Sequence, residues 1–223
     1  MCGRFTQYNT REEYLAYLAD ESERAIPFYP APIDRYNVAP GTKVLLLNEH
    51  NEQLHLDAVH WGYAPGWWDK APLINARVET AASSRMFSSL WQHVRAIVFA
   101  DGWYEWKHNG KIKQPYFIHR RDGNPLLMAA IGSTPFERGD EHEGFLIVTA
   151  AADKGLVDIH DRRPLILTPE AARLWLNPET TGKEAGGLAC NGSIPADEFT
   201  WHAVSKAVGN VKNQGRDLIS PIS

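Results

Sequence analysis

The second half of the chain is a series of short apolar segments separated by turn residues. Asn109-Gly110 and Asp122-Gly123 are dipeptides typical of tight turns between strands. The segments around these turns are rich in β-branched and aromatic residues, as strands are. They predict strands at residues 96–100, 103–107, 116–119, 126–131, 145–150 and 164–167. This pattern predicts that the second half of the chain forms a mostly antiparallel sheet.

Capping signals predict helices on either side of these strands. Thr10 and Glu13 form a capping box before an amphipathic segment, and Thr168 followed by Pro169 is a typical helix start. Four prolines within residues 27–41 argue against a regular element there. The other predicted elements are helices at residues 11–20, 84–93 and 169–176, a strand at 73–78, and a hairpin of 43–47 and 54–59.

These elements predict an α+β fold. Helices and strands do not alternate regularly, which argues against a doubly wound parallel sheet. No repeat or linker divides the sequence, so residues 1–223 are expected to form one domain. The best match is a mostly antiparallel, barrel-like mixed sheet with surrounding helices.

The composition and charge fit a folded protein of the cytoplasm. No apolar run approaches the ~20 residues of a membrane span, and the first residues lack the apolar core of a signal peptide. The two cysteines, Cys2 and Cys190, are expected to stay reduced there. A net charge of −4 argues against coating of nucleic acid through the overall field, but it allows a local basic strip. Arginines that could form this strip, or could equally be isolated solvated side chains, are Arg4, Arg77, Arg85, Arg162 and Arg163.

Cys2 points most strongly to a chemical function. Removal of Met1 would give it a free α-amine beside its thiol, and such an amine has a pKa of ~7.7–8.0. The pair can form an imine with an aldehyde and close a thiazolidine ring, or the amine can act as the base for thiol attack on an amide. A second-position cysteine taken alone is more often incidental. Here Gly3 permits close approach and Phe5 can tether the terminus to a core, which favours a functional reading.

Three polar residues within apolar or aromatic segments are candidate partners for Cys2. Asn75 follows two aliphatic residues, Glu105 lies between two aromatic ones, and His160 follows Ile159. The aromatic neighbours are expected to raise the pKa of Glu105 into the range useful for proton transfer, and histidine exchanges protons near neutral pH. An outward-facing strand position explains each residue taken singly. Their joint occurrence favours a site.

Six motifs spread along the chain are distinctive in combination. They are residues 1–5 (MCGRF), 36–40 (YNVAP), 61–68 (WGYAPGWW), 75–80 (NARVET), 101–106 (DGWYEW) and 159–164 (IHDRRP). In these motifs the sequence resembles the SRAP (SOS response associated peptidase) family, and the resemblance covers essentially the whole chain. It implies a barrel-like mixed sheet with surrounding helices, in agreement with the pattern of predicted elements.

The resemblance implies a covalent trap for abasic sites in single-stranded DNA. Cys2 is then the nucleophile that forms a thiazolidine with the ring-opened sugar. Asn75 positions the abasic site, Glu105 shuttles protons and His160 bonds to the sugar ring oxygen. Self-reversal of the crosslink, weak lyase activity and autocatalytic removal of Met1 are further expectations. DNA contacts are implied for Arg4, Asn37, Pro40, Trp67, Trp68, Arg77 and Arg162.

The resemblance also implies a monomer that needs no metal or other cofactor. Replication-fork proteins are candidate partners, and a cytoplasmic protein that joins the nucleoid when it acts on DNA is expected. Arg163 stands where many family members have Met, which affects only the expected local packing and charge. Cys190 matches no site position and is expected to be a buried or incidental thiol.

Two other functions remain open from the residues alone. Glutamine-dependent amidotransferase domains also begin Met-Cys-Gly, so Cys2 could serve an amidohydrolase, although that activity needs an ammonia-using partner domain. The eight tryptophans could instead form a single-strand-binding module in which Cys2 has no role. Replacement Cys2→Ala separates the module from the covalent trap, because only the trap would lose a crosslink that survives denaturation.

Overall fold

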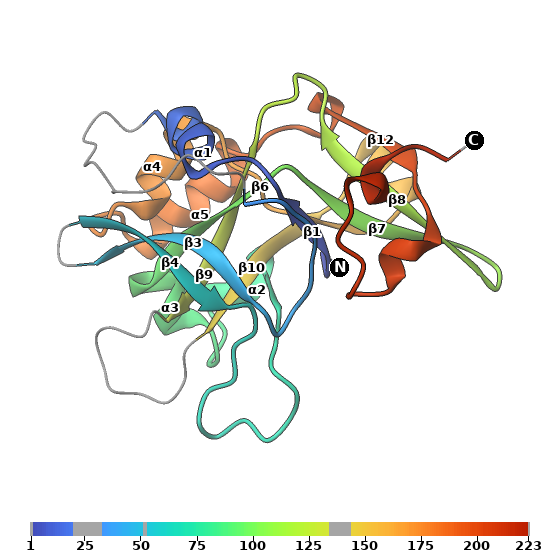
Figure 1. Cartoon of the computed structure of the whole chain (residues 1–223). Coiled ribbons are helices and arrows are strands. Elements are labelled where there is room, and N and C mark those ends of the chain that lie inside the picture. Colours follow the sequence, from blue (N-terminus) through green and yellow to red (C-terminus); the bar gives the residue numbers. More distant parts are fainter. Residues whose placement is uncertain (1, 20–32, 51–52, 134–143, 223) are drawn as a thin grey trace.

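Two packed β-sheets form the centre of the protein (Figure 1). The computed structural model describes residues 2–19, 33–50, 53–133 and 144–222. Within these residues the smaller sheet contains, in spatial order, β12 (Phe199–Ala203), β8 (Ile112–Arg120), β7 (Gly102–Asn109), β1 (Phe5–Gln7) and β2 (Arg35–Val38). All of its strand pairs are antiparallel.

The larger sheet lies against the smaller one. Its spatial order is β11 (Arg162–Pro164), β10 (Gly144–Ala151), β9 (Leu126–Ser133), β6 (Arg95–Ala100), β3 (Lys43–His50) and β4 (Gln53–His60), and these neighbours pair antiparallel. The short strand β5 (Asn75–Arg77) pairs in parallel with β10.

Helices cover the outer face of the larger sheet (Figure 1). Those of the described residues are α1 (Arg11–Leu18), α2 (Val78–Ala81), α3 (Ser88–His93), α4 (Pro169–Leu176) and α5 (Gly182–Asn191). The capping box of Thr10 and Glu13 opens α1, and the Thr168 side chain caps α4 with Pro169 in its first turn. In the part of the chain that the structure describes, no helix has the length and hydropathy needed to cross a membrane.

The larger sheet is buried on both faces, which explains the continuous apolar runs of its central strands. In β6 and β9, Val98 and Met128 face the core between the sheets, together with Phe5 of β1. Their neighbours Ile97 and Leu127 belong to the cluster under the helices. Strands buried on both faces lose the apolar and polar alternation of a half-exposed strand.

The predicted α+β fold with mostly antiparallel strands is confirmed, although the two sheets do not close into one barrel. The hairpin and the strands predicted at 96–100, 103–107, 116–119, 126–131 and 145–150 are all present. The strand predicted at 164–167 was wrong in its bounds, because β11 covers Arg162–Pro164 and the residues after it make only isolated bridges.

Three other predictions need correction. The segment expected to lack regular structure contains β2, an edge strand that the prolines flank and do not interrupt; residues 27–32 of that segment lie outside the described residues. The strand predicted at 73–78 is shorter, because Val78 already starts α2. The helix predicted at 84–93 begins only at Ser88, after turns that use the carbonyls of Thr80 and Ser84.

Candidate functional site

Cys2 lies inside the protein, three residues before β1. Strand β1 pairs antiparallel with β7, with Phe5 opposite Trp103, and the Tyr104 N–H donates to the Arg4 carbonyl at 2.9 Å. Continued toward the N-terminus, this register places Gly3 opposite Glu105, and Cys2 is the next residue, close enough for the Glu105 charge to act on its thiol. The Cys2 side chain has no exposed surface and belongs to the core between the sheets. The position is therefore fixed by strand pairing, unlike that of a loose terminus.

Burial and charge both keep the Cys2 thiol protonated. Its pKa is raised far above the ordinary value, first because burial penalises the thiolate and second because Glu105 contributes a nearby negative charge. A thiolate beside Glu105 would place two negative charges in one dry site. The arrangement fits a thiol that loses its proton only as it reacts.

Glu105 is the group best suited to take that proton. Its side chain is only 3% exposed, and burial raises its pKa from 4.5 to about 7. At neutral pH its charged and neutral forms are then similarly populated, which is the condition under which a carboxyl group gives and takes protons most readily. The raised pKa of Glu105 that the sequence predicted is therefore confirmed, and its main cause is burial of the side chain.

His160 shares a pocket with Glu105. The pocket has a volume of about 380 Å³, and its other lining residues are Trp106, His108, Lys113 and Gly209. The Nδ1 atom of His160 accepts the Arg162 backbone N–H at 3.0 Å, and burial lowers the pKa of the ring. The neutral ring therefore carries its hydrogen on Nε2. The Asp161 carboxylate, 2.9 Å from Nδ1, can form an ion pair with His160 only when the ring is protonated.

Asn75 lies at the start of β5 and is held against β10. Its side-chain nitrogen donates to the Ile147 carbonyl at 3.4 Å, while Oδ1 is buried without a hydrogen-bond partner among the described residues. A buried acceptor of this kind is suited to a ligand donor such as a hydroxyl group. Asn75 does not line the pocket that contains Glu105 and His160.

Arg77 and Arg162 flank the same strand, β10. Both are paired with it near its end, with Arg77 opposite Thr149 and Arg162 opposite Ala151. The Arg162 guanidinium binds both carboxylate oxygens of Glu79, at 2.7 and 2.9 Å, and also the Thr149 carbonyl at 2.7 Å. Arg162 is thus held in one orientation, with a carboxylate where an anionic ligand would bind.

Trp67 and Trp68 form an aromatic pair on the loop before β5, with Trp67 exposed and Trp68 partly buried. Their ring centres lie 6.1 Å apart at an interplanar angle of 84°, and Trp67 is 59% exposed. The guanidinium of Arg85 lies 5.6 Å from the Trp67 ring centre, and the Lys70 ammonium 5.5 Å from that of Trp68. An exposed ring with cations beside it is suited to stacking on a nucleobase near phosphates. Pro40 is partly exposed in the turn after β2.

Arg4 and Asn37, two of the predicted DNA contacts, are bonded to each other and to a C-terminal segment of the chain. Asn37 is 1% exposed, accepts a hydrogen bond from Arg4 at 2.8 Å, and donates to the carbonyls of Val208, Asn210 and Asn213. Arg4 also donates to the Val208 carbonyl at 2.7 Å. Both side chains anchor the segment that carries Gly209 to the pocket, which fits a positioning role.

Arg163 and Cys190, the two residues that do not match the family pattern, differ in burial. Arg163 is buried, donates to the Ile194 carbonyl at 2.8 Å and lies over the Phe199 ring, so it is part of the packing. Cys190 was expected to be either buried or incidental, and burial is excluded because this thiol is exposed on α5.

The structure adds residues to the candidate site that the sequence argument did not select. Glu79 belongs to the motif at residues 75–80, but only the structure shows that it forms an ion pair with Arg162. His108 and Lys113 are opposite each other in the β7–β8 hairpin, whose turn is formed by Gly110 and Lys111, whereas a turn at Asn109-Gly110 would have paired His108 with Lys111. Within the described ranges, no group of three or more His, Cys, Asp or Glu side chains is arranged to hold a metal ion.

Comparison with known proteins assigns the family. Residues 1–211 match the model of the SOS response associated peptidase family, SRAP. The chain belongs to the SRAP family. This SRAP protein is 72% identical to abasic site processing protein YedK of Escherichia coli K12 over 222 residues, which cover 100% of both chains. It is 30% identical to abasic site processing protein YoqW of Bacillus subtilis 168, over 98% of this chain and 99% of the relative.

A solved structure supports the same fold. A phage-related protein from Bordetella bronchiseptica superposes on this SRAP protein with a TM-score of 0.78 and 36% sequence identity, over 92% of this chain and 95% of the other. The family predicted from the six motifs is therefore confirmed by comparisons that cover nearly the whole chain.

Proposed function

We propose that this SRAP protein senses abasic sites in single-stranded DNA and binds them covalently through Cys2. The observation that carries the proposal is the buried pair of Cys2 and Glu105, a thiol beside a carboxyl group with a pKa of about 7. The names of YedK and YoqW as abasic site processing proteins support it. An abasic sugar in its ring-opened form presents an aldehyde, which is the partner that a 1,2-aminothiol requires.

The proposed chemistry starts with removal of Met1, either by the protein itself or by an aminopeptidase, because Met1 ties up the Cys2 nitrogen in a peptide bond. His160, with a hydrogen on Nε2, assists opening of the sugar ring. The Cys2 amine attacks the aldehyde carbon, and loss of water gives an imine. The thiol then adds to the imine carbon, a carbon–sulfur bond forms, and the thiol proton passes through Glu105 to the nitrogen to complete a thiazolidine.

The strand is held mainly through its backbone. Arg77 and Arg162 bind phosphates on either side of β10. Trp67 and Trp68 stack on a base next to the lesion, and Pro40 acts as a wedge beside the abasic site. Contacts to phosphates and to base faces carry no sequence information, which suits a protein that must act wherever a base is missing. Asn75 contributes its buried Oδ1 as an acceptor for a sugar hydroxyl.

Two slower reactions follow from the same intermediate. An imine at the sugar carbon acidifies the adjacent C–H, so a base such as Glu105 can start β-elimination and produce weak lyase activity. Return of a proton from Glu105 to the thiazolidine sulfur reopens the ring, and water then releases the aldehyde. The crosslink is therefore expected to reverse slowly.

The test uses a single-stranded oligonucleotide with one abasic site. Protein whose N-terminal residue is Cys2, verified by mass spectrometry, should give a shifted band on a denaturing gel that survives heating. An oligonucleotide with a tetrahydrofuran in place of the sugar, which lacks an aldehyde, should give none. Absence of a heat-stable band with the true abasic site would overturn the proposal.

Three variants separate the roles of amine and thiol. Cys2→Ser keeps the amine, so it should form a crosslink only when borohydride reduces the imine. A chain with one residue inserted between Met1 and Cys2 keeps the thiol but holds its nitrogen in a peptide bond, so it should form no heat-stable crosslink in the absence of borohydride. Cys190→Ser removes the exposed second thiol and is the matched control, with an unchanged band. A single-strand-binding module without chemistry would retain binding and show no band with any variant.

A further inference from the structure

Asp101 is a buried acidic residue at the junction of β6 and β7, and the proposed chemistry does not use it. Its side chain is only 6% exposed, and burial raises its pKa to about 6, so the carboxyl group is ionised at pH 8. It stands four residues before Glu105 in the chain. A buried carboxylate is costly unless it is hydrogen-bonded, so its partners indicate which part of the structure it stabilises.

Both carboxylate oxygens of Asp101 bind the segment that follows β1. Oδ2 accepts the Tyr8 backbone N–H at 2.6 Å and the Tyr14 hydroxyl at 2.5 Å, and Oδ1 accepts the Asn9 side-chain amide at 2.8 Å. The Tyr14 hydroxyl in turn accepts the Asn9 backbone N–H at 3.2 Å. Tyr8 and Asn9 lie between β1 and α1, and Tyr14 belongs to α1. The carboxylate therefore joins the end of β1 and the first turns of α1 to the start of β7.

Strand β1 is short, so bonds at its ends matter for its position. It covers Phe5–Gln7 and pairs with β7 through Phe5 and Thr6. The Thr6 carbonyl also accepts the Asp101 backbone N–H at 3.0 Å. A slip of one residue would turn the side chains of a strand to the opposite face. Cys2 lies three residues before β1, and a displacement of this strand would therefore move Cys2 as well.

We propose that Asp101 is a positioning residue for the covalent reaction, because its carboxylate holds the segment after β1 and thereby keeps Cys2 close to Glu105. Without the carboxylate, the Tyr8 N–H loses its acceptor and the segment opens to water, since an unsatisfied buried donor is costly. Local opening of a terminal segment requires less free energy than unfolding of the two sheets. The effect on crosslinking rests on the proposed function, whereas the effect on the burial of Cys2 does not.

The first test is labelling of the Cys2 thiol without DNA. All proteins carry Cys190→Ser, which removes the exposed second thiol, so a chromogenic disulfide reagent reports Cys2 alone. In this parent protein the Cys2 thiol is buried and should react slowly. At pH 8, Asp101→Ala should raise the labelling rate about tenfold or more, because the open segment exposes the thiol. An unchanged rate would overturn the proposal.

Low concentrations of urea separate local opening from a general loss of stability. Urea favours an opening in proportion to the surface that the opening exposes. The N-terminal segment exposes little surface when it opens, so the labelling rate of Asp101→Ala should hardly change up to about 1 M urea. If this rate rises with urea as steeply as the equilibrium constant of global unfolding, Asp101 stabilises the fold as a whole and the proposal is wrong.

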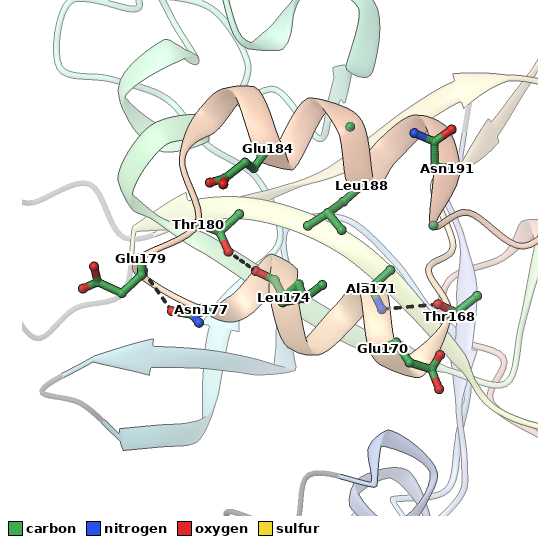
Figure 2. Close-up of a pocket in the computed structure, with 12 residues that line it drawn as sticks. Thr168, Glu170, Ala171, Leu174, Asn177, Glu179, Thr180, Glu184, Leu188 and Asn191 are labelled. Carbon is green, nitrogen blue, oxygen red and sulfur yellow. Dashed lines mark hydrogen bonds between the residues drawn. The ribbon is translucent and has the colours of Figure 1, made fainter.

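Two hydroxyl deletions give a matched comparison that keeps the buried carboxylate in place. Tyr14→Phe removes a hydroxyl bonded to Asp101 and keeps the ring, which stacks on Phe99. Thr180→Val removes a hydroxyl that donates to the Leu174 carbonyl at 2.7 Å, between α4 and α5 (Figure 2). Tyr14→Phe should raise the labelling rate about threefold, whereas Thr180→Val should leave it unchanged. Equal effects of the two deletions would contradict the proposal, even if Asp101→Ala fails to fold.

The second test is the rate of crosslinking with saturating oligonucleotide that contains one abasic site. Asp101→Ala should slow formation of the heat-stable band about tenfold or more, because a small displacement of a reacting group is costly. Its affinity for an undamaged oligonucleotide should stay within about twofold of the parent. Weaker affinity with an unchanged crosslinking rate would overturn the positioning role. If the parent itself forms no band while Asp101→Ala still labels faster, the proposed function fails and the control of Cys2 burial by Asp101 stands.

Discussion

Replacement of Glu105 by glutamine should stabilise the protein at high pH while it removes the proposed proton shuttle. The carboxyl group is buried, and its pKa is raised from 4.5 to about 7, chiefly by burial. Between these two values the folded protein keeps a proton that the unfolded chain has lost. Wild-type stability from this group is therefore highest at low pH, falls as the pH rises from about 4.5 to about 7, and is constant above.

The magnitude follows from the size of the pKa change. A rise from 4.5 to about 7 corresponds to about 3 kcal/mol of unfolding free energy, at about 1.4 kcal/mol per pKa unit. Most of this falls between pH 5 and pH 8. Glutamine has a similar shape and never ionises, so the variant should gain about 2–3 kcal/mol relative to wild type between these pH values.

The assay is urea unfolding of both proteins at pH 5 and pH 8. Asp101 is also buried, with a pKa raised to about 6, and it contributes to the pH dependence of both proteins equally. The difference between wild type and Glu105→Gln therefore isolates Glu105. The assignment of a raised pKa to Glu105 would be refuted if the difference in unfolding free energy between the two proteins did not change with pH. It would also be refuted if the variant became less stable relative to wild type as the pH rises.

Three further results are expected. Glu79→Gln should strengthen binding of an undamaged single-stranded oligonucleotide about fivefold in fluorescence anisotropy, because an exposed ion pair holds Arg162 by up to about 1 kcal/mol; unchanged affinity would mean that Glu79 does not compete with phosphate. Trp67→Ala should weaken the same binding by ~1–3 kcal/mol without lowering the melting temperature, since the ring is 59% exposed, and a lower melting temperature would indicate a structural role. The rate of crosslink formation on the denaturing gel should rise with pH through about 7, the pKa of Glu105, and Glu105→Gln should lack this step while keeping the later rise from the amine; a step of equal size in the variant would exclude Glu105 as the proton acceptor.

The sequence predicted the strands better than the connections between them. Central strands such as β6 and β9 are recognisable because both faces are buried and their residues are almost all apolar. β2 was missed because proline signals dominated its surroundings, and its pairing partner β1 is distant in sequence. The end of β11 depends on which residues β10 pairs with, which local patterns do not encode.

In the candidate site, too, the sequence predicted features that depend on neighbouring residues and missed those that depend on contacts between distant ones. The raised pKa of Glu105 was predictable, because two aromatic neighbours already implied burial. The Glu79–Arg162 ion pair was not, since the two residues are 83 positions apart and meet only through the pairing of β5 and β11 with β10. The family resemblance implied a DNA contact for Arg162, whereas the fold supplies the carboxylate that a phosphate would have to displace.

Arg4 and Asn37 show why membership in a motif does not define a residue's role. Both belong to motifs shared with the family, and both carry groups that could bind DNA, yet their side chains converge on the carbonyl of Val208. The next residue, Gly209, lines the pocket that contains Glu105 and His160. Arg4, two residues after Cys2, and Asn37 of β2 therefore both bind the C-terminal segment that lines one side of the pocket. A family motif can be retained for the geometry of a site as well as for contact with its ligand, and only the hydrogen-bond partners distinguish the two.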